Sequence, residues 1–390
     1  MQIQFVDQSK ARTKLFPLTY TRPVADLRVG FLKIFEKWIK TLQASSHGYH
    51  TESYLSRKFP SCDSPTLFIY DGLMPNPTLI AAIKSLPART KLIFNEEVLA
   101  STAKLDLCDN AITYSGEVNK IVYPWDIFGQ NGAEIKSDFD LLTEGRACQP
   151  IDDPHTRTYG DQIFLEKGVK IKAAILNAES GPIYLGADTE VGEGAIIRGP
   201  FALCDQSVIS MAAKIRGGTT VGPYSKVGGE VSNAVIQGYS NKGHDGFLGN
   251  SVLGEWCNLG ADTNNSNLKN NYTNVKMWDF ENNRFQDSGL QFCGLIMGDH
   301  SKCGINTMFN TGTTVGVSAN IFGEGFPRTI IPSFSWGGSS GFSTYKLNKV
   351  CELAELVMSR RQVVFDEIEK DILQHIFEIT SDQRIWEKAD

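Results

Sequence analysis

The sequence predicts a chain of two parts, an α/β domain followed by a parallel β-helix. Apolar residues recur at every sixth position in the second half, without a miss from Leu185 to Val227. Glycine is frequent, with 36 residues in the chain, and concentrates between 180 and 341. The first half lacks this rhythm and alternates short apolar runs with a helical segment.

The six-residue period predicts short strands that turn a corner at regular intervals. Its members are Leu185, Val191, Ile197, Leu203, Ile209, Ile215, Val221 and Val227, and later Met297, Cys303, Phe309, Val315 and Ile321. This period does not fit an amphipathic helix, but it suits strands, whose side chains alternate with a period of two. Neighbouring glycines permit tight turns or positive φ. A β-sandwich with many turns is the alternative, although sandwiches show no strict short period.

The rhythm breaks twice, and the breaks hold the candidate chemistry. The first break, 233–247, contains His244 between two glycines, and histidine suits a general base near neutral pH. A solvated loop histidine is the alternative. His300 competes for the same role, but it lies in an unbroken repeat and is expected to face solvent. The second break, 262–292, is polar and asparagine-rich, and we expect a long loop there.

Motifs between 210 and 340 resemble the acetyltransferase half of the bifunctional glucosamine-1-phosphate acetyltransferase and N-acetylglucosamine-1-phosphate uridyltransferase family. The matching segments are AKIRGGT at 213–219, EVS at 230–232, NKGHDGFLG at 241–249 and LGEWCNLGADT at 253–263. The whole chain looks like an alternative bacterial branch of that family, with a shortened nucleotidyltransferase-like N-terminal domain. The resemblance implies a left-handed β-helix, a homotrimer with active sites between neighbouring prisms, and acetyl-CoA as acyl donor.

The resemblance also assigns roles to single residues. His244 matches the catalytic histidine, and Glu230 matches the carboxylate that orients it. Three further positions match binding residues: the sugar-phosphate arginine at Arg216, the acceptor asparagine at Asn267 and a backbone contact near the thioester at Ala261. Lys242 is expected to bind phosphate or to keep the loop soluble. Glu230 and Arg216 could instead be solvated residues on an outer face.

Three polar residues of the family are missing. A phosphate-binding lysine falls at Ser232, and two tyrosines fall at Phe247 and Leu268. Buried polar groups of a site discriminate strongly between substrates. These losses leave open a different amino sugar, replacement by Lys242 and Lys269, or a catalytically weak site.

The N-terminal half reads as α/β with a parallel sheet, because strands at 66–70 and 91–95 flank a helix at 77–86. The segment LFPLTYTRPVADLRVG at 15–30 resembles the signature of sugar nucleotidyltransferases, but no glycine precedes it within VDQSKARTKLF. The three arginines that could compensate in nucleotide binding are Arg12, Arg22 and Arg28.

Asp71 follows the strand at 66–70 and matches the metal-binding aspartate of these enzymes. An ordinary turn residue is the equally valid alternative. If the domain is active, it would use Mg²⁺ and UTP, with Asp71 among the nucleotide-binding and metal-binding residues. A degenerate binding or assembly domain is the alternative.

The expected boundaries are 1–155 for the first domain with its connecting helix, 156–341 for the β-helix and 342–390 for a C-terminal helical segment. A net charge of −6 argues against nucleic acid as the main partner. No apolar stretch approaches the ~18 residues of a membrane span, and the start lacks a signal core. The eight scattered cysteines suit reduced thiols in the cytoplasm.

Together these features predict an acyl-CoA-dependent sugar N-acyltransferase. Its substrate would be glucosamine 1-phosphate or a related amino sugar or sugar nucleotide, acetylated for UDP-N-acetylglucosamine synthesis. Uridyltransferase activity of the first domain stays open. Two alternatives are a non-catalytic β-helix scaffold and a nucleotidyltransferase with a regulatory β-helix.

Overall fold

The computed structural model describes residues 1–388 and divides into two compact units. The first unit comprises residues 1–15, 21–27 and 32–123. The second unit comprises 16–20, 28–31 and the chain from 124 onward. Helix α4 (Pro124–Thr143) is the connecting helix expected within the first domain, but it groups with the coils instead.

Buried polar contacts explain this grouping. The side chain of Asn131 on α4 donates to the carbonyl of Gly218 at 2.8 Å and accepts from the backbone N–H of Gly30 at 2.7 Å. The ring of Phe31 stacks on Tyr184 with centroids 4.4 Å apart. Residues 28–31 and α4 therefore pack on the β-helix, a contact that the expected domain boundary near 155 did not include.

The first unit is built on a six-stranded sheet in the order β2-β1-β3-β5-β4-β6. Its strands are β1 (Gln2–Val6), β2 (Ser46–His50), β3 (Leu67–Tyr70), β4 (Thr90–Phe94), β5 (Glu97–Ser101) and β6 (Asn110–Thr113). Its helices are α1 (Ser9–Lys14), α2 (Ile34–Leu42) and α3 (Pro77–Lys84), with short 3₁₀ turns at Val24–Asp26, Ser53–Leu55 and Leu105–Leu107.

The expected strands and helix are confirmed as β3, β4 and α3, but the sheet is mixed rather than parallel. Strand β5 runs antiparallel to both β3 and β4. The reason lies in the two-residue turn Asn95–Glu96, where both residues have positive φ (45° and 68°). Such turns join antiparallel hairpin strands and match their twist.

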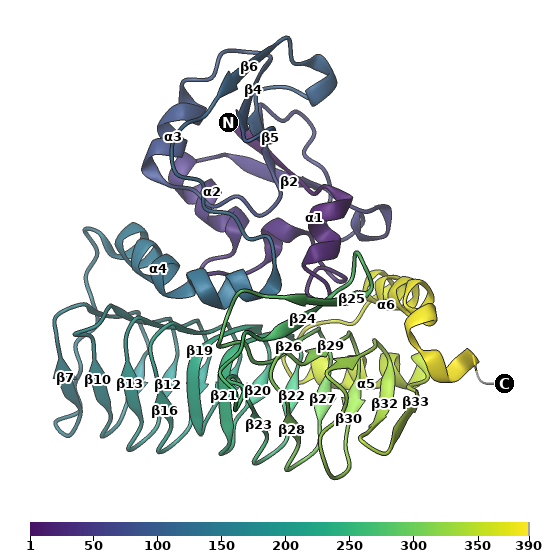
Figure 1. The fold of residues 1–390 in the computed structure, drawn as a ribbon. Coiled ribbons are helices and arrows are strands. Elements are labelled where there is room, and N and C mark those ends of the chain that lie inside the picture. The colour runs from purple at the N-terminus through teal and green to yellow at the C-terminus, as the bar shows by residue number, and fades with distance from the viewer. Residues whose placement is uncertain (389–390) are drawn as a thin grey trace. The chain divides into compact units, whose positions relative to one another are not determined.

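The second unit is a left-handed parallel β-helix with helices at its C-terminal end (Figure 1). The first ladder contains β7 (Arg157–Tyr159), β8 (Ile163–Leu165), β10 (Ile175–Asn177), β11 (Ile183–Leu185), β13 (Ile196–Arg198), β14 (Phe201–Leu203), β16 (Lys214–Ile215), β17 (Thr219–Val221), β19 (Glu230–Gly238), β21 (Phe247–Glu255), β26 (Ile296–Met297), β29 (Thr314–Val315) and β31 (Ile330–Ile331). The second ladder contains β9 (Lys170–Ile171), β12 (Glu190–Val191), β15 (Val208–Ile209), β18 (Lys226–Val227), β20 (Asn241–Lys242), β22 (Asn258–Leu259), β27 (Lys302–Cys303), β30 (Asn320–Ile321), β32 (Ser335–Gly338) and β33 (Gly341–Thr344). A short third ladder pairs β23 (Asn264–Asn265) with β28 (Met308–Phe309).

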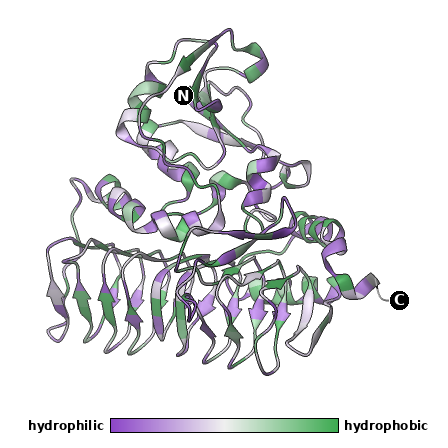
Figure 2. Cartoon of the chain, viewed as in Figure 1, coloured by the Kyte–Doolittle hydropathy of each residue, from purple (hydrophilic) through white to green (hydrophobic). Residues whose placement is uncertain are grey.

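The register confirms the coil predicted from the period of six. Ile197 pairs with Ile215, 18 positions later, so one coil contains three hexapeptides. Both side chains are buried, with 0% and 2% exposed. Hydrophobic and hydrophilic residues alternate along the strands (Figure 2), as one buried and one outer face require. Each buried aliphatic side chain contributes about 1.5–3 kcal/mol to folding.

The first break of the rhythm shortens the coils instead of looping out. Strands β19 and β21 have nine residues each and continue around a corner. Val221 pairs with Ile236, only 15 positions later, and Ile236 pairs with Leu253, 17 positions later. The backbone of the His244 segment is therefore held by the ladders on both sides.

The second break is an insertion with its own structure, so the expected long loop is only partly right. Leu253 pairs with Met297, 44 positions later, and the ladders continue undisturbed across the insertion. The inserted chain forms an antiparallel hairpin of β24 (Lys276–Asp279) and β25 (Arg284–Asp287).

The C-terminal segment contains two helices, α5 (Leu347–Ser359) and α6 (Glu367–Ile379), and 3₁₀ turns at Ser381–Gln383 and Ile385–Lys388. The side chain of Asp366 caps α6 by accepting from the N–H groups of Ile368 and Glu369. Residues 389 and 390 of the expected segment lie outside the described residues. Within residues 1–388, no helix combines the length and the apolar character needed to cross a membrane.

Candidate active site

His244 lies in the turn between β20 and β21, on the surface of the β-helix. Its side chain is exposed. Gly229, with φ of +71°, lets the neighbouring coil approach this turn, because a Cβ there would lie 2.9 Å from the His244 carbonyl oxygen. The backbone N–H of Glu230 donates to the Gly246 carbonyl at 3.1 Å. Close backbone packing thus places the start of β19 directly beside the histidine turn.

The Glu230 carboxylate faces Arg216 in this structure. Arg216 Nη2 lies 2.9 Å from Glu230 Oε1, with the two side chains 68% and 27% exposed. Within residues 1–388, no hydrogen bond joins the imidazole of His244 to Glu230. An exposed pair of this kind stabilises the fold by at most about 1 kcal/mol, so a bound anion could replace it with little loss of stability.

Lys242 points into the β-helix, which contradicts its expected contact with phosphate. It pairs with the inward-facing Val227 one coil below, and only 2% of it is exposed. Its ammonium donates to the His244 carbonyl oxygen at 2.6 Å. Burial lowers the pKa of Lys242 to about 8, against the opposing effect of Asp245 and Asp262. The amine therefore supports the histidine turn from inside.

Asn267 joins the same outer surface one coil further along. Its amide donates to the Asn250 side-chain oxygen at 2.8 Å. A Cβ built on Gly249 would lie 2.8 Å from the Asn267 amide and 2.5 Å from the ring of Phe247. The Phe247 ring and the Asn267 amide thus meet above Gly249. Glu230 pairs with Phe247 in the ladder, so carboxylate, ring and amide follow one another along the surface.

Ala261 lies close to the histidine turn because the next residue, Asp262, is hydrogen-bonded to that turn. The N–H of Asp262 donates to the Asp245 carbonyl at 3.0 Å, and the Ala261 carbonyl accepts from Asn306 at 2.8 Å. The structure therefore brings His244, Glu230, Arg216, Asn267 and Ala261 into adjacent coils. It separates only Lys242 from this surface, because that side chain is internal.

Sequence reasoning missed two asparagines that organise the site. Asn264 accepts from the Phe247 N–H at 2.8 Å, and Asn250 holds Asn267. The asparagine-rich composition of the insertion was the available signal. His300, expected to face solvent, is instead buried with 9% exposed and stacks on Trp256, with centroids 6.2 Å apart. It is a packing residue of a corner and not an alternative base.

In the first unit, two aspartates mark the carboxyl ends of neighbouring parallel strands. Asp71 follows β3 with φ of +51°, and it accepts from the Gln8 N–H at 2.9 Å and from Lys120 Nζ at 3.3 Å. Asp7 follows β1, and burial raises its pKa to about 6 despite the nearby Arg12. Burial likewise raises the pKa of Asp71. Ligands of α/β sheets bind at this edge.

The predicted nucleotide-binding arginines are not free to meet phosphate. Arg12 is 2% exposed and donates to the Arg22 carbonyl, Thr51 and Tyr54 at 3.0–3.2 Å. Arg22 is 4% exposed and lies 3.5 Å from Asp26. Arg28 belongs to the second unit, where its guanidinium donates to the Gln237 carbonyl at 3.2 Å. In this structure each of these cations therefore meets an internal acceptor, which argues against the expected role in nucleotide binding.

The residues around Asp71 do not fit a magnesium ion. A lysine ammonium and a backbone N–H already occupy its oxygens, and Mg²⁺ requires several free oxygen ligands. Within residues 1–388, no group of three or more His, Cys, Asp or Glu side chains is placed to bind a metal.

Residues 3–147 match the model of a sugar nucleotidyl transferase family. The bifunctional protein GlmU of Corynebacterium glutamicum is 33% identical over 203 residues, which cover 48% of this chain and 38% of that protein. The chain is therefore similar to sugar nucleotidyl transferases in its first part and to bifunctional GlmU proteins. A bifunctional sugar-1-phosphate nucleotidylyltransferase/acetyltransferase of Sulfurisphaera tokodaii is 31% identical over 160 residues, covering 40% of this chain and 37% of the relative.

A third relative is the uncharacterized acetyltransferase YaiX of Escherichia coli. It is 28% identical over 169 residues, covering 43% of this chain and 71% of YaiX. The matches to the two bifunctional relatives thus span less than two fifths of their length.

Proposed function

We propose that the chain is an acyl-CoA-dependent sugar N-acyltransferase, with His244 as general base. Its acceptor would be glucosamine 1-phosphate or a related amino sugar, and its donor acetyl-CoA. The observation that carries the proposal is the exposed imidazole of His244, in a turn whose backbone is bonded to Glu230, the ion-pair partner of Arg216. The names of the bifunctional relatives and of YaiX support it.

The chemistry follows from the charges of this surface. The amino group of the sugar attacks the thioester carbonyl, and His244 takes the proton that the nitrogen loses. The carbonyl oxygen becomes an oxyanion, which backbone N–H groups of the turns stabilise. The tetrahedral intermediate then expels the thiolate of coenzyme A, and the imidazolium returns the proton to it.

Arg216 and Glu230 have linked roles in this proposal. A guanidinium binds phosphate in a bidentate manner, so a sugar phosphate competes with Glu230 for Arg216. Phosphate binding would release the carboxylate, whose backbone already lies beside the His244 turn. The released Glu230 could then orient the imidazole and stabilise its charged form. In this proposal, the Arg216–Glu230 ion pair is the resting arrangement of that switch.

A homotrimer completes the proposal, with the site shared between neighbouring β-helices. Exposed apolar side chains on the coils support it, since Met211 is 71% exposed and Ile305 is 70% exposed. Exposed apolar surface commonly marks protein contacts.

The test measures release of coenzyme A from acetyl-CoA with glucosamine 1-phosphate and a panel of amino sugars and sugar nucleotides. His244→Ala should lower kcat by about 10²- to 10⁴-fold. Its melting temperature should not change, because the side chain is exposed. His155→Ala, at another exposed histidine, is the matched control. Equal rates in wild type and His244→Ala would exclude the mechanism. If no sugar causes release of coenzyme A, only the non-catalytic scaffold hypothesis remains.

A second candidate function rests on the family match of residues 3–147. The first unit would join a sugar 1-phosphate to UTP and release pyrophosphate. The buried, paired arginines and the Asp71–Lys120 contact oppose this activity. Pyrophosphate release from UTP and N-acetylglucosamine 1-phosphate decides between an active and a degenerate domain.

A further inference from the structure

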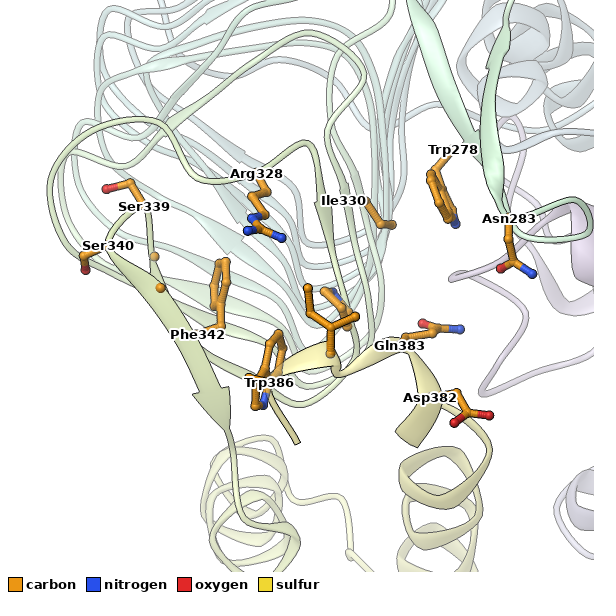
Figure 3. Close-up of a pocket in the computed structure, with 14 residues that line it drawn as sticks. Trp278, Asn283, Arg328, Ile330, Ser339, Ser340, Phe342, Asp382, Gln383 and Trp386 are labelled. Atoms are coloured by element: carbon orange, nitrogen blue, oxygen red, sulfur yellow. The ribbon is translucent and has the colours of Figure 1, made fainter. Parts of the chain in front are cut away.

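A pocket of about 740 Å³ opens at the C-terminal end of the β-helix (Figure 3). Its walls are the hairpin β24–β25, the last strands of the coils and the segment 382–386, all within the second unit. Strand β32 lies four strands from β20 in the second ladder. At about 4.8 Å per strand, the pocket is about 19 Å from the His244 turn. It is therefore a separate site.

Three aromatic rings surround the open space (Figure 3). Phe342 and Trp386 lie with their ring centroids 5.9 Å apart. Trp278 enters from the hairpin, where Phe285 packs edge-on against it at 5.1 Å. Flat aromatic surfaces from two sides of a pocket favour a planar, conjugated ligand.

One cation faces this aromatic surface. Arg328 is exposed, and within residues 1–388 no carboxylate or hydrogen-bond acceptor contacts its guanidinium. Asp382 is the one carboxylate among the lining residues, and it lies on the opposite side of the pocket from Arg328 (Figure 3). An anionic group of a ligand would therefore meet Arg328, whose fork of donors suits phosphate.

The terminal wall of the pocket is anchored, so the pocket is formed before a ligand arrives. Arg384, with 1% of its side chain exposed, donates to the Phe377 carbonyl at 3.1 Å and to Glu387 at 2.7 Å. The Trp386 indole N–H donates to Thr344 at 2.8 Å. Between these anchors Ile385 is 56% exposed and lines the pocket. A preformed, largely apolar cavity with few polar groups is typical of small-molecule sites.

We propose that this pocket binds a nucleotide, with its base against the rings of Trp278, Phe342 and Trp386 and its phosphate on Arg328. The volume lies within the range of ligand pockets, about 300–1,000 Å³. The ring and the guanidinium supply the two contacts that a base with a phosphate needs. This assignment goes beyond acyl transfer and does not depend on it.

The experiment reads the pocket directly by ¹⁹F NMR of the full chain labelled with fluorotryptophan. The chain has six tryptophans, and Trp278→Phe and Trp386→Phe assign the two pocket resonances. The ligands are adenosine 5′-monophosphate, adenosine, ribose 5-phosphate and coenzyme A. Arg328→Gln is the test variant, and Arg361→Gln, an exposed arginine outside the pocket, is the control.

Saturable shifts of the Trp278 and Trp386 resonances are expected with the nucleotide. Arg328→Gln should weaken the nucleotide about tenfold or more and leave adenosine unchanged, whereas Arg361→Gln should change neither. Loss of the stacking ring in Trp386→Ala should weaken binding about 5- to 150-fold.

If the resonances shift with coenzyme A but not with adenosine 5′-monophosphate, the pocket binds the nucleotide end of a larger molecule. If they shift with both compounds, the pocket binds a free nucleotide as well. No shift with any nucleotide, or shifts that do not depend on Arg328, would overturn the proposal. Because the readout is the ring environment, an inactive acyltransferase would not affect the result.

Discussion

Replacing Lys242 by methionine separates stability from activity in this β-helix. The lysine places an ammonium in the interior, where it pairs in register with Val227 and holds the His244 carbonyl at 2.6 Å. Methionine fills a similar volume without the charge. We expect a more stable protein at pH 7 and a slower enzyme, because the turn that carries the base loses its internal support.

The magnitude follows from the pKa of Lys242, which burial lowers from 10.5 to about 8. At 1.36 kcal/mol per unit, the buried charge destabilises the folded state by about 3 kcal/mol below pH 8. Loss of the hydrogen bond to the His244 carbonyl returns about 1–2 kcal/mol. The variant should therefore gain about 1–2 kcal/mol in free energy of unfolding at pH 7.

The pH dependence has a defined sign. Between pH 8 and 10.5 the unfolded chain binds the lysine proton and the folded chain does not, so wild-type stability rises with pH in that window. As pH falls from 10.5 through 8 the same stability is lost. Lys242→Met should lack this component, and the difference between wild type and variant isolates it from other titrating groups.

Three measurements test this prediction: urea unfolding, hydrogen exchange of peptides from β19 to β21, and acyl-transfer kinetics. Lys302→Met is a matched control, since Lys302 donates to the His300 carbonyl at 2.9 Å and its pKa is also lowered to about 8 by burial. It should change the pH profile of stability in the same way and leave kcat intact. A Lys242→Met protein that is less stable at pH 7 and fully active would refute the reasoning.

Three other changes test the geometry of the two units. Gly229→Ala should destabilise the coils by about 1–3 kcal/mol and lower activity, because φ is +71° and the new Cβ would lie 2.7 Å from the Gly246 carbonyl. Gly145→Ala is the control, because φ is +72° and no atom lies near the new Cβ. Its thermal melt measures the cost of the backbone conformation without a steric clash. The wild-type protein should lose up to about 3 kcal/mol of stability as pH rises from 4 to 7, because the folded pKa of Asp7, about 6, exceeds the ordinary value. Asp7→Asn should abolish this loss, and a variant that keeps the same slope in urea titrations would contradict the reasoning. Phe247→Tyr should lower KM for a sugar phosphate by about 5- to 10-fold if the acceptor carries an oxygen there, and an unchanged KM would point to another acceptor.

The coil was predictable because its signal repeats many times. Ile197 and Ile215 each occupy the interior of successive coils, so chance errors at single positions do not disturb the pattern. The position of Lys242 was not predictable, since the shortened coil between Val221 and Ile236 shifts the register by three residues before it. Lys242 therefore occupies an interior position that the six-residue period alone does not predict for it.

The candidate site divides in the same way. The surface of His244, Arg216 and Asn267 could be found by motif, because neighbouring coils bring fixed sequence separations together. The arginines of the first unit could not, since sequence does not tell whether a guanidinium such as that of Arg12 meets solvent or an internal carbonyl. Hairpin β24–β25 escaped notice because its polar strands carry little alternation.

The ladders on either side of the hairpin join as if the extra residues were absent, with Leu253 beside Met297. Such an appendage can grow, shrink or change its side chains while the stack beneath it keeps every partner. Trp278 reaches the terminal cavity from this appendage. Selection can therefore retune what that cavity accepts without touching the imidazole several coils away.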